Sequence, residues 1–204
     1  PYAQVNPICY QAPVAPHLAA ISEQQPIDET LLNNALLNWQ SLDLQQLLIE
    51  GAGGLNDVSA DENGTVYVTD SRARRVYEVK DGKASMLLDS SKLKGPNGIL
   101  KHKGSLYVLD AGSMYRMEKD GSLTKLAEGM EGGTDGIENV GGGDFLVSTW
   151  GGVVYYVAAD GTKQVLLDGR GDKINSADIG YDAAKRIVYI PTFWKNSVVA
   201  YELR

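Results

Sequence analysis

The sequence of 204 residues predicts a mainly β protein, in which a partial β-propeller over residues 55–204 follows a short α/β-derived helical segment over residues 1–54. Three observations support this prediction. A repeat of about 40 residues occurs four times, apolar residues alternate along each copy, and the composition changes near residue 54.

The change in composition divides the chain into two parts. Residues 1–54 contain no Lys or Arg, whereas residues 55–204 contain all 19 basic residues. The net charge is −7, and the basic residues form no stripe along the sequence, so we expect no nucleic-acid partner. Because no apolar run approaches the roughly 18 residues that a spanning helix needs, we also expect no membrane span.

The first part has the pattern of an α/β fragment. Apolar residues recur at helical spacing over residues 28–42 (DETLLNNALLNWQSL), which predicts an amphipathic helix. The apolar run at 44–50 (LQQLLIE) leads into EGAGG at 50–54 and predicts a buried strand followed by a Gly-rich turn. The single cysteine, Cys9, leaves a cytoplasmic and an exported location both open.

The second part repeats with a period typical of propeller blades. Its copies begin with NDV, NGI, DGI and DIG at residues 56, 97, 135 and 178, which gives spacings of 41, 38 and 43 residues. Each copy continues into two strands, and an Asp-Gly pair in the first three predicts a two-residue hairpin into a further strand. The fourth copy reaches Arg204 without that strand, so we expect an open blade edge through which the chain can self-associate.

The repeat also predicts a polar site on the propeller axis. Propeller symmetry would bring together Asn56, Asn97, Asp135 and Asp178, which stand at the starts of the four copies. Amide and carboxylate oxygens suit a hard divalent cation such as Ca²⁺ or Mg²⁺. The alternative is that Asn and Asp stand there for turn formation alone, because both tolerate left-handed backbone.

Residues 55–204 resemble the propeller family of senescence marker protein, gluconolactonase and luciferin-regenerating enzyme. The resemblance rests on four phrases: LNDVSADENGTVYVTDS (55–71), GPNGILKHKGSLYVLD (95–110), GTDGIENVGGGDFLVSTWGG (133–152) and NSADIGYDAAKRIVYIPTFWKNSVVAYEL (175–203). It implies the last four blades of a six-bladed propeller. It further implies a divalent cation (Ca²⁺, Mg²⁺ or Zn²⁺) held by Asn97, Asp135 and Asn56. Asp135 and Asp178 are the catalytic candidates of a metal-dependent lactone or ester hydrolase, or of a small-molecule binding protein.

Residues 1–54 resemble the middle of dethiobiotin synthase, an enzyme of biotin biosynthesis. The phrases are NPICYQAPVAPHLAA (6–20), PID (26–28) and LLIEGAGG (47–54). The resemblance implies that Glu50 helps to hold Mg²⁺ and that Gly51 and Gly53 approach the phosphates of ATP. The sequence contains no G-x-x-x-x-G-K-[ST] loop. Two alternatives to the lactonase function therefore stay open: an inactive chimera of two fragments, and a residual ATP/Mg²⁺-binding fragment. Whether the chain is an enzyme is left undecided.

Overall fold

The computed structural model describes residues 24, 30, 34 and 55–204. The chain divides into two compact units, Pro1–Gly53 and Gly54–Arg204. Most of the first unit lies outside the described residues, including nearly all of the predicted helix over 28–42 and the whole predicted strand and turn over 44–54. In the described part of the chain, no helix has the length and hydropathy needed to cross a membrane.

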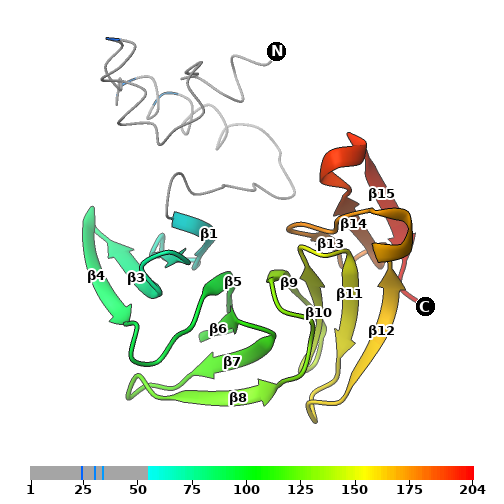
Figure 1. Ribbon diagram of the computed structural model, residues 1–204. Helices are drawn as coiled ribbons and strands as arrows, with labels where there is room; N and C mark the ends of the chain where they lie inside the picture. Colours follow the sequence, from blue (N-terminus) through cyan, green and yellow to red (C-terminus); the bar gives the residue numbers. More distant parts are fainter. Residues whose placement is uncertain (1–23, 25–29, 31–33, 35–54) are drawn as a thin grey trace. The chain divides into compact units, whose positions relative to one another are not determined.

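The second unit consists of four antiparallel sheets, each built from strands that follow one another in the sequence (Figure 1). The first sheet contains β1 (Leu55–Ala60), β2 (Val66–Asp70), β3 (Arg75–Lys80) and β4 (Lys83–Leu88). The second contains β5 (Pro96–His102), β6 (Ser105–Asp110), β7 (Ser113–Met117) and β8 (Leu123–Ala127).

The third sheet contains β9 (Thr134–Gly141), β10 (Asp144–Thr149), β11 (Val153–Val157) and β12 (Lys163–Asp168). The fourth has three strands, β13 (Gly180–Asp182), β14 (Ile187–Pro191) and β15 (Val198–Glu202). Single 3-10 turns, η1 (Arg170–Asp172) and η2 (Phe193–Lys195), lie in the connections. These sheets confirm the predicted mainly β, propeller-like fold.

The first strand of each sheet contacts the first strand of the next, β1 with β5, β5 with β9, and β9 with β13. In Figure 1 these strands line the inner side of the row of sheets, and β4, β8 and β12 lie at its outer side. The sheets therefore pack face to face as successive blades, and the starts of β5 and β9 face the same inner region.

The hydrophobic core lies between successive sheets and follows from the alternation of apolar residues. Along β10, Leu146 packs with Val188 and Ile190 of the fourth sheet, whereas its neighbour Val147 packs with Leu109 and Met114 of the second. Adjacent residues of a strand point to opposite faces, so a strand that is apolar at every position can serve two cores. The run FLV in β10 is therefore the sequence signature of a blade enclosed on both sides.

The hairpin turns only partly follow the prediction. The Asp-Gly pair at 81–82 has positive φ at both residues, 50° and 72°, as a two-residue type I′ turn requires. In the pairs at 120–121 and 160–161 only the glycine has a positive φ, so the prediction of two-residue turns is wrong there. Asp120 instead accepts a hydrogen bond from the backbone N–H of Ser122 (2.9 Å), which favours a longer loop.

Candidate functional site

The polar residues at the starts of the inner strands occupy matching places. Ile99 and Ile137 hold the same register position in the second and third sheets. Ile99 pairs with Val108 of β6, which pairs with Tyr115 of β7, and Ile137 pairs with Val147 of β10, which pairs with Tyr155 of β11. Asn97 and Asp135 each stand two residues before these isoleucines. The predicted equivalence of the NGI and DGI starts therefore describes the register of the two sheets.

Asn97 and Asp135 are in direct contact. The Nδ2 of Asn97 donates a hydrogen bond to Oδ1 of Asp135 (3.1 Å), which joins the starts of β5 and β9. The other amide atom of Asn97, Oδ1, is buried and has no hydrogen-bond partner among the described residues. An unpaired buried carbonyl oxygen costs about 1–3 kcal/mol. This oxygen is therefore a natural contact for a ligand.

A third residue of the site, Asp57, was not a candidate in the sequence analysis. Its Oδ1 accepts a hydrogen bond from the N–H of Val58 (2.8 Å), and its Oδ2 accepts one from the N–H of Ile99 (2.7 Å) on the next inner strand. Burial, together with the charges of Asp178 and Asp135, raises the pKa of Asp57 from 3.8 to about 8, although the hydrogen bonds from the two N–H groups lower it. Asp57 is therefore protonated near neutral pH.

Asp178 belongs to the same electrostatic neighbourhood, since its charge acts on Asp57. Its Oδ1 accepts a hydrogen bond from the N–H of Ile179 (3.0 Å). A Cβ placed on Gly136 would lie 2.6 Å from this same oxygen and 2.5 Å from the Ile179 nitrogen. The residue beside Asp135 thus closely approaches Asp178, and both predicted catalytic residues lie within one region.

Asn56 is held in a different way. Its Nδ2 donates a hydrogen bond to Oγ of Ser71 (2.9 Å), and that hydroxyl donates one to the carbonyl oxygen of Pro96 (2.5 Å). The Ser71 hydroxyl therefore links Asn56 and the first sheet to Pro96, the residue that precedes Asn97. The role of Asn56 as a metal ligand stays a prediction.

The described residues offer few protein ligands for a cation. Within residues 55–204, no three His, Cys, Asp or Glu side chains are close enough together to hold a metal ion. The two side chains that do meet are those of Asn97 and Asp135, through the amide nitrogen of Asn97, and the amide oxygen of Asn97 is the oxygen left without a partner among the described residues. Ca²⁺ and Mg²⁺ accept such oxygens together with several waters, whereas Zn²⁺ prefers nitrogen and sulfur ligands. The donor chemistry thus favours a hard cation.

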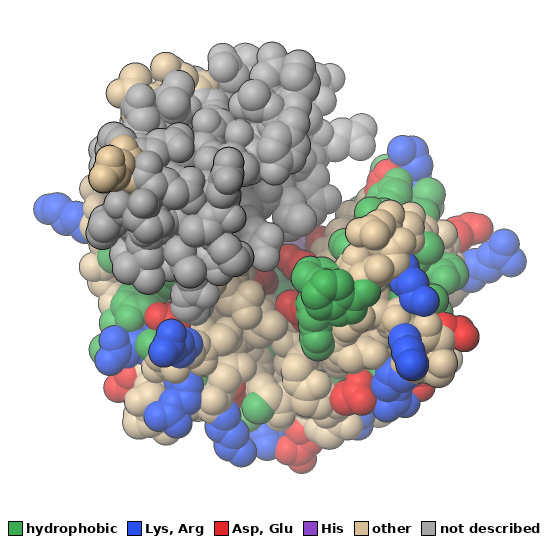
Figure 2. All heavy atoms as spheres, turned by 45° about the horizontal axis from the view of Figure 1, so that its top comes forward, with side chains coloured by type: hydrophobic (Ala, Val, Ile, Leu, Met, Phe, Trp, Pro, Cys, Tyr) green, Lys and Arg blue, Asp and Glu red, His purple; other side chains and the backbone are tan. Residues whose placement is uncertain are grey.

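Three exposed aromatic side chains lie at the same end of the sheets. Trp150 follows the last residue of β10, and its N–H donates a hydrogen bond to the carbonyl of Gly133 (2.8 Å), two residues before Asp135. The ring of Phe193 contacts Trp150 edge-to-face at 4.6 Å between centroids and Trp194 at 4.7 Å. Figure 2 shows hydrophobic side chains gathered beside acidic ones on one face of the molecule. We call these three residues the aromatic cluster.

Phe193 has an unusual backbone. Its φ is +46°, in the left-handed region that a bulky residue rarely adopts. Such a conformation costs about 1–3 kcal/mol and persists where the surrounding structure imposes it, often at ligand-binding sites. The 3-10 turn η2 therefore holds the ring of Phe193 in its exposed position at a free-energy cost.

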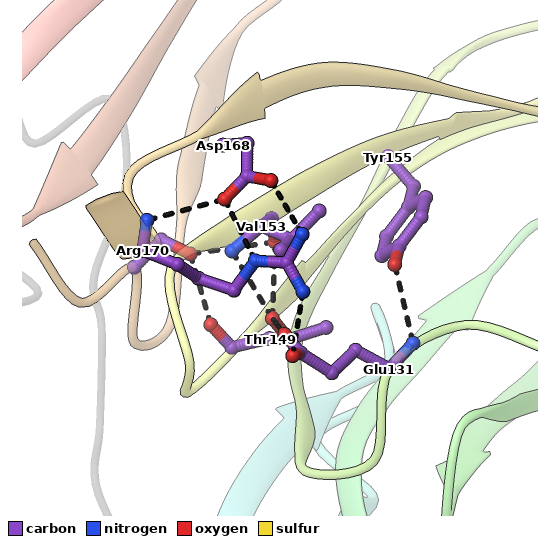
Figure 3. Close-up of polar contacts among 7 residues, drawn as sticks. Glu131, Thr149, Val153, Tyr155, Asp168 and Arg170 are labelled. Carbon is purple, nitrogen blue, oxygen red and sulfur yellow. Dashed lines mark hydrogen bonds and ion pairs between the residues drawn. The ribbon is translucent and has the colours of Figure 1, made fainter. Parts of the chain in front are cut away.

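A hydrogen-bonded network fixes the loop that carries Trp150 (Figure 3). Arg170 pairs with Glu131 (3.0 Å) and with Asp168, whose pKa it lowers to about 2 mainly through hydrogen bonding. Thr149 is fully buried, and its Oγ1 accepts a hydrogen bond from the N–H of Val153 (3.1 Å). The loop between β10 and β11 is thus anchored from both sides, which preorganises one edge of the site.

The predicted nucleotide-contacting residues Glu50, Gly51 and Gly53 lie outside the described residues, so their roles stay predictions. Asp57 could have been found from the sequence. It stands where the second and third copies have Gly98 and Gly136, and a charged residue in place of a repeated glycine is a departure from the repeat. The sequence indicated the aromatic cluster less clearly, because a tryptophan near the end of a strand, such as Trp150 or Trp194, is also typical of core packing.

The comparisons with known proteins separate the two parts of the chain. No family model matches the chain. Over 55 residues it is 44% identical to the ATP-dependent dethiobiotin synthetase of Legionella pneumophila, and this stretch covers 27% of the chain and 26% of that enzyme. The chain therefore spans about a quarter of the length of the curated relatives it matches.

The fold is that of propeller proteins. A catalytically inactive virginiamycin B lyase from Staphylococcus aureus, solved with quinupristin, is similar with a TM-score of 0.63 at 13% identity, over 76% of this chain and 54% of that one. A chain of a nidogen/laminin complex is similar with a TM-score of 0.62 at 23% identity, over 78% of this chain and 62% of that one. This chain thus spans less than two thirds of either structure. At these identities the likeness shows the fold alone, and the gluconolactonase resemblance stays a prediction.

Proposed function

We propose that the propeller unit binds a small molecule at the inner-strand starts, together with a hard divalent cation, and hydrolyses a lactone or ester bond. One observation carries this proposal. The amide oxygen of Asn97 is buried without a hydrogen-bond partner among the described residues, and it belongs to a side chain in contact with the carboxylate of Asp135. A cation held by these two residues would satisfy that oxygen.

The side chains have complementary roles in such a reaction. A hard cation, when bound, would polarise the carbonyl oxygen of the ligand. Asp178 would accept a proton from the attacking water, and Asp57 would donate its proton to the leaving alkoxide, so that an acid and an alcohol are formed. The pKa of Asp57, raised to about 8 by burial and by Asp178, keeps it protonated for this task.

The aromatic cluster supplies an apolar surface for the ligand. Trp150 and Phe193 follow β10 and β14, and they lie at the end of the sheets where Asp135 and Asp178 are found. An exposed aromatic face contributes favourably to binding because it removes apolar ligand surface from water. We therefore propose a ligand with an apolar ring next to its ester or lactone group.

Cation binding is the first test. Ca²⁺ should raise the midpoint of thermal unfolding in the parent chain, and Asn97→Ala and Asp135→Ala should each abolish the increase. The matched control is Asn63→Ala, in the exposed turn between β1 and β2. An unchanged midpoint in the parent chain, or a shift that survives in Asn97→Ala, would contradict the cation site.

A second candidate function concerns the first unit. The 44% identity to dethiobiotin synthetase over 55 residues supports a residual ATP/Mg²⁺ site at Glu50, Gly51 and Gly53. ATP with Mg²⁺ should then protect the chain against thermal unfolding, and Glu50→Gln should remove the protection. If neither Ca²⁺ nor ATP/Mg²⁺ has an effect, the chain is better described as an inactive chimera of two fragments.

A further inference from the structure

A serine of β10 joins the two segments that carry the predicted catalytic residues. The Oγ of Ser148 accepts a hydrogen bond from the N–H of Gly136 (2.8 Å), the residue directly after Asp135. The same hydroxyl donates a hydrogen bond to the carbonyl oxygen of Ala177 (2.7 Å), the residue directly before Asp178. Ser148 is fully buried. One hydroxyl group therefore links the start of β9 to the segment that leads into β13.

The hydroxyl acts where the pairing of β9 with β10 is irregular. The register shifts between Val147 and Thr149, so the pairing of these two strands passes over Ser148. Bulges in antiparallel sheets often lie beside active sites, where they change the direction of a side chain. Here the side chain of Ser148 takes the place of a backbone acceptor for the N–H of Gly136. It therefore fixes the backbone next to Asp135.

The first sheet has a hydroxyl at the same place. Thr69 of β2 stands at the register position of Ser148, one residue after the valine that pairs with the inner strand. Its Oγ1 accepts a hydrogen bond from the N–H of Asp57 (2.9 Å), as Ser148 does from Gly136. In the second sheet Leu109 occupies this position. The blade fold itself therefore does not require a hydroxyl there, and threonine can replace serine in this contact.

The two carboxyl groups on either side of this link lie in one electrostatic neighbourhood. The charges of Asp135 and Asp178 both act on Asp57, and like charges in one region repel each other. A fixed contact between their backbones opposes their separation. A Ca²⁺ site gains affinity from the number of nearby carboxylates and from the rigidity of its ligands. The link through Ser148 can therefore contribute to both.

We propose that Ser148 is a positioning residue for the cation site, and that its hydroxyl holds Asp135 and Asp178 together around a hard cation. This inference rests on the cation site proposed above at Asn97 and Asp135. The hydroxyl acts through its two backbone partners. Loss of a contact that orients metal ligands typically lowers metal affinity by about 10–100-fold, so we expect a loss of that size without the hydroxyl.

The test compares Ser148→Thr with Ser148→Val by isothermal titration calorimetry with Ca²⁺. Both new side chains are β-branched and add the same bulk, so the difference between the two variants isolates the hydroxyl. Ser148→Thr should bind Ca²⁺ about as tightly as the parent chain, and Ser148→Val about 10–100-fold more weakly. The matched control is Thr65→Val, which removes a buried hydroxyl bonded to Asp61 in the turn between β1 and β2. It should leave the Ca²⁺ dissociation constant unchanged.

Circular dichroism would establish that each variant keeps its β structure, and Ser148→Ala is a second variant without the hydroxyl should Ser148→Val fail to fold. A folded variant that lacks the hydroxyl, is less stable in urea, and binds Ca²⁺ as tightly as Ser148→Thr would overturn the proposal, because the hydroxyl would then serve the fold alone. An equal loss of Ca²⁺ affinity in Thr65→Val would overturn it as well. In both cases the cation site itself stands. If the parent chain binds no Ca²⁺, the proposed function fails and this inference fails with it.

Discussion

The buried carboxyl of Asp57 should make the stability of the chain fall as the pH rises from about 4 to about 8. Its pKa is about 8 in the folded chain against an ordinary value of 3.8, so within this window the folded state keeps a proton that the unfolded state has released. The free energy of unfolding then decreases by up to about 1.4 kcal/mol per pH unit for this one group. The stabilising contribution of Asp57 is fully present below the pKa of the unfolded state, and it is lost above the pKa of the folded state.

Asp57→Asn removes the titration but also changes the hydrogen bonds. Each carboxyl oxygen of Asp57 accepts one backbone N–H, from Val58 and from Ile99. An amide offers one acceptor oxygen, so one of the two N–H groups loses its partner, at a cost of about 1–3 kcal/mol that does not vary with pH. We therefore expect Asp57→Asn to be less stable than the parent at pH 5.5. Its deficit should shrink by up to about 3 kcal/mol by pH 7.5, because the parent loses stability over those two pH units.

The assay is urea unfolding followed by far-ultraviolet circular dichroism at several pH values without divalent cations. Asp61→Asn is the control, since hydrogen bonding to Thr65 lowers the pKa of Asp61 and its titration falls below this window. Its curve should run parallel to that of the parent. His102, whose pKa is lowered by burial, is present in all three proteins. Its contribution to the pH dependence therefore cancels when their free energies of unfolding are compared. Parallel curves for the parent and Asp57→Asn would refute the raised pKa and the proton-donor role.

Two further substitutions test the packing around the site. Gly98→Ala should destabilise the chain by about 1–3 kcal/mol or more, because a Cβ there would lie 2.0 Å from the carbonyl oxygen of Asp135, whereas Gly95→Ala, with open space around it, should have little effect. Thr149→Val should cost about 1–3 kcal/mol, because the buried N–H of Val153 loses its acceptor. Both are measured by urea unfolding at constant pH. Equal stability of Gly98→Ala and Gly95→Ala would contradict the close approach of β5 and β9.

The control for the buried hydroxyl is Thr124→Val, on the exposed side of β8. Substitutions of exposed residues usually change stability by less than about 0.5 kcal/mol. If both threonine variants lose the same stability, the loss comes from strand propensity or side-chain polarity in general. The anchoring of the Trp150 loop by Thr149 would then be the wrong explanation.

The repeat made the fold predictable, because period and alternation are local properties of the sequence. A spacing near 40 residues and the alternating strands lead directly to four sheets, and the FLV run of β10 indicates a blade covered on both faces. The turns were less predictable. The pairs at 81–82 and 120–121 are both Asp-Gly, yet only the first has positive φ at both residues. The hydrogen bond from the N–H of Ser122 to the side chain of Asp120 favours the longer loop at 120–121, and the Asp-Gly dipeptide alone does not predict this bond.

The site was predictable only where the repeat is regular. Asn97 and Asp135 follow from their equivalent positions, but the chemistry of Asp57 depends on the neighbouring strand. At the matching places of the next two copies, Gly98 and Gly136 leave no room for a Cβ beside the following inner strand. At position 57 the carboxyl occupies that space and accepts the N–H of Ile99 instead. The close approach of neighbouring inner strands, which requires glycine in the second and third blades, therefore buries the carboxyl group of Asp57 in the first blade. That burial raises the pKa of Asp57.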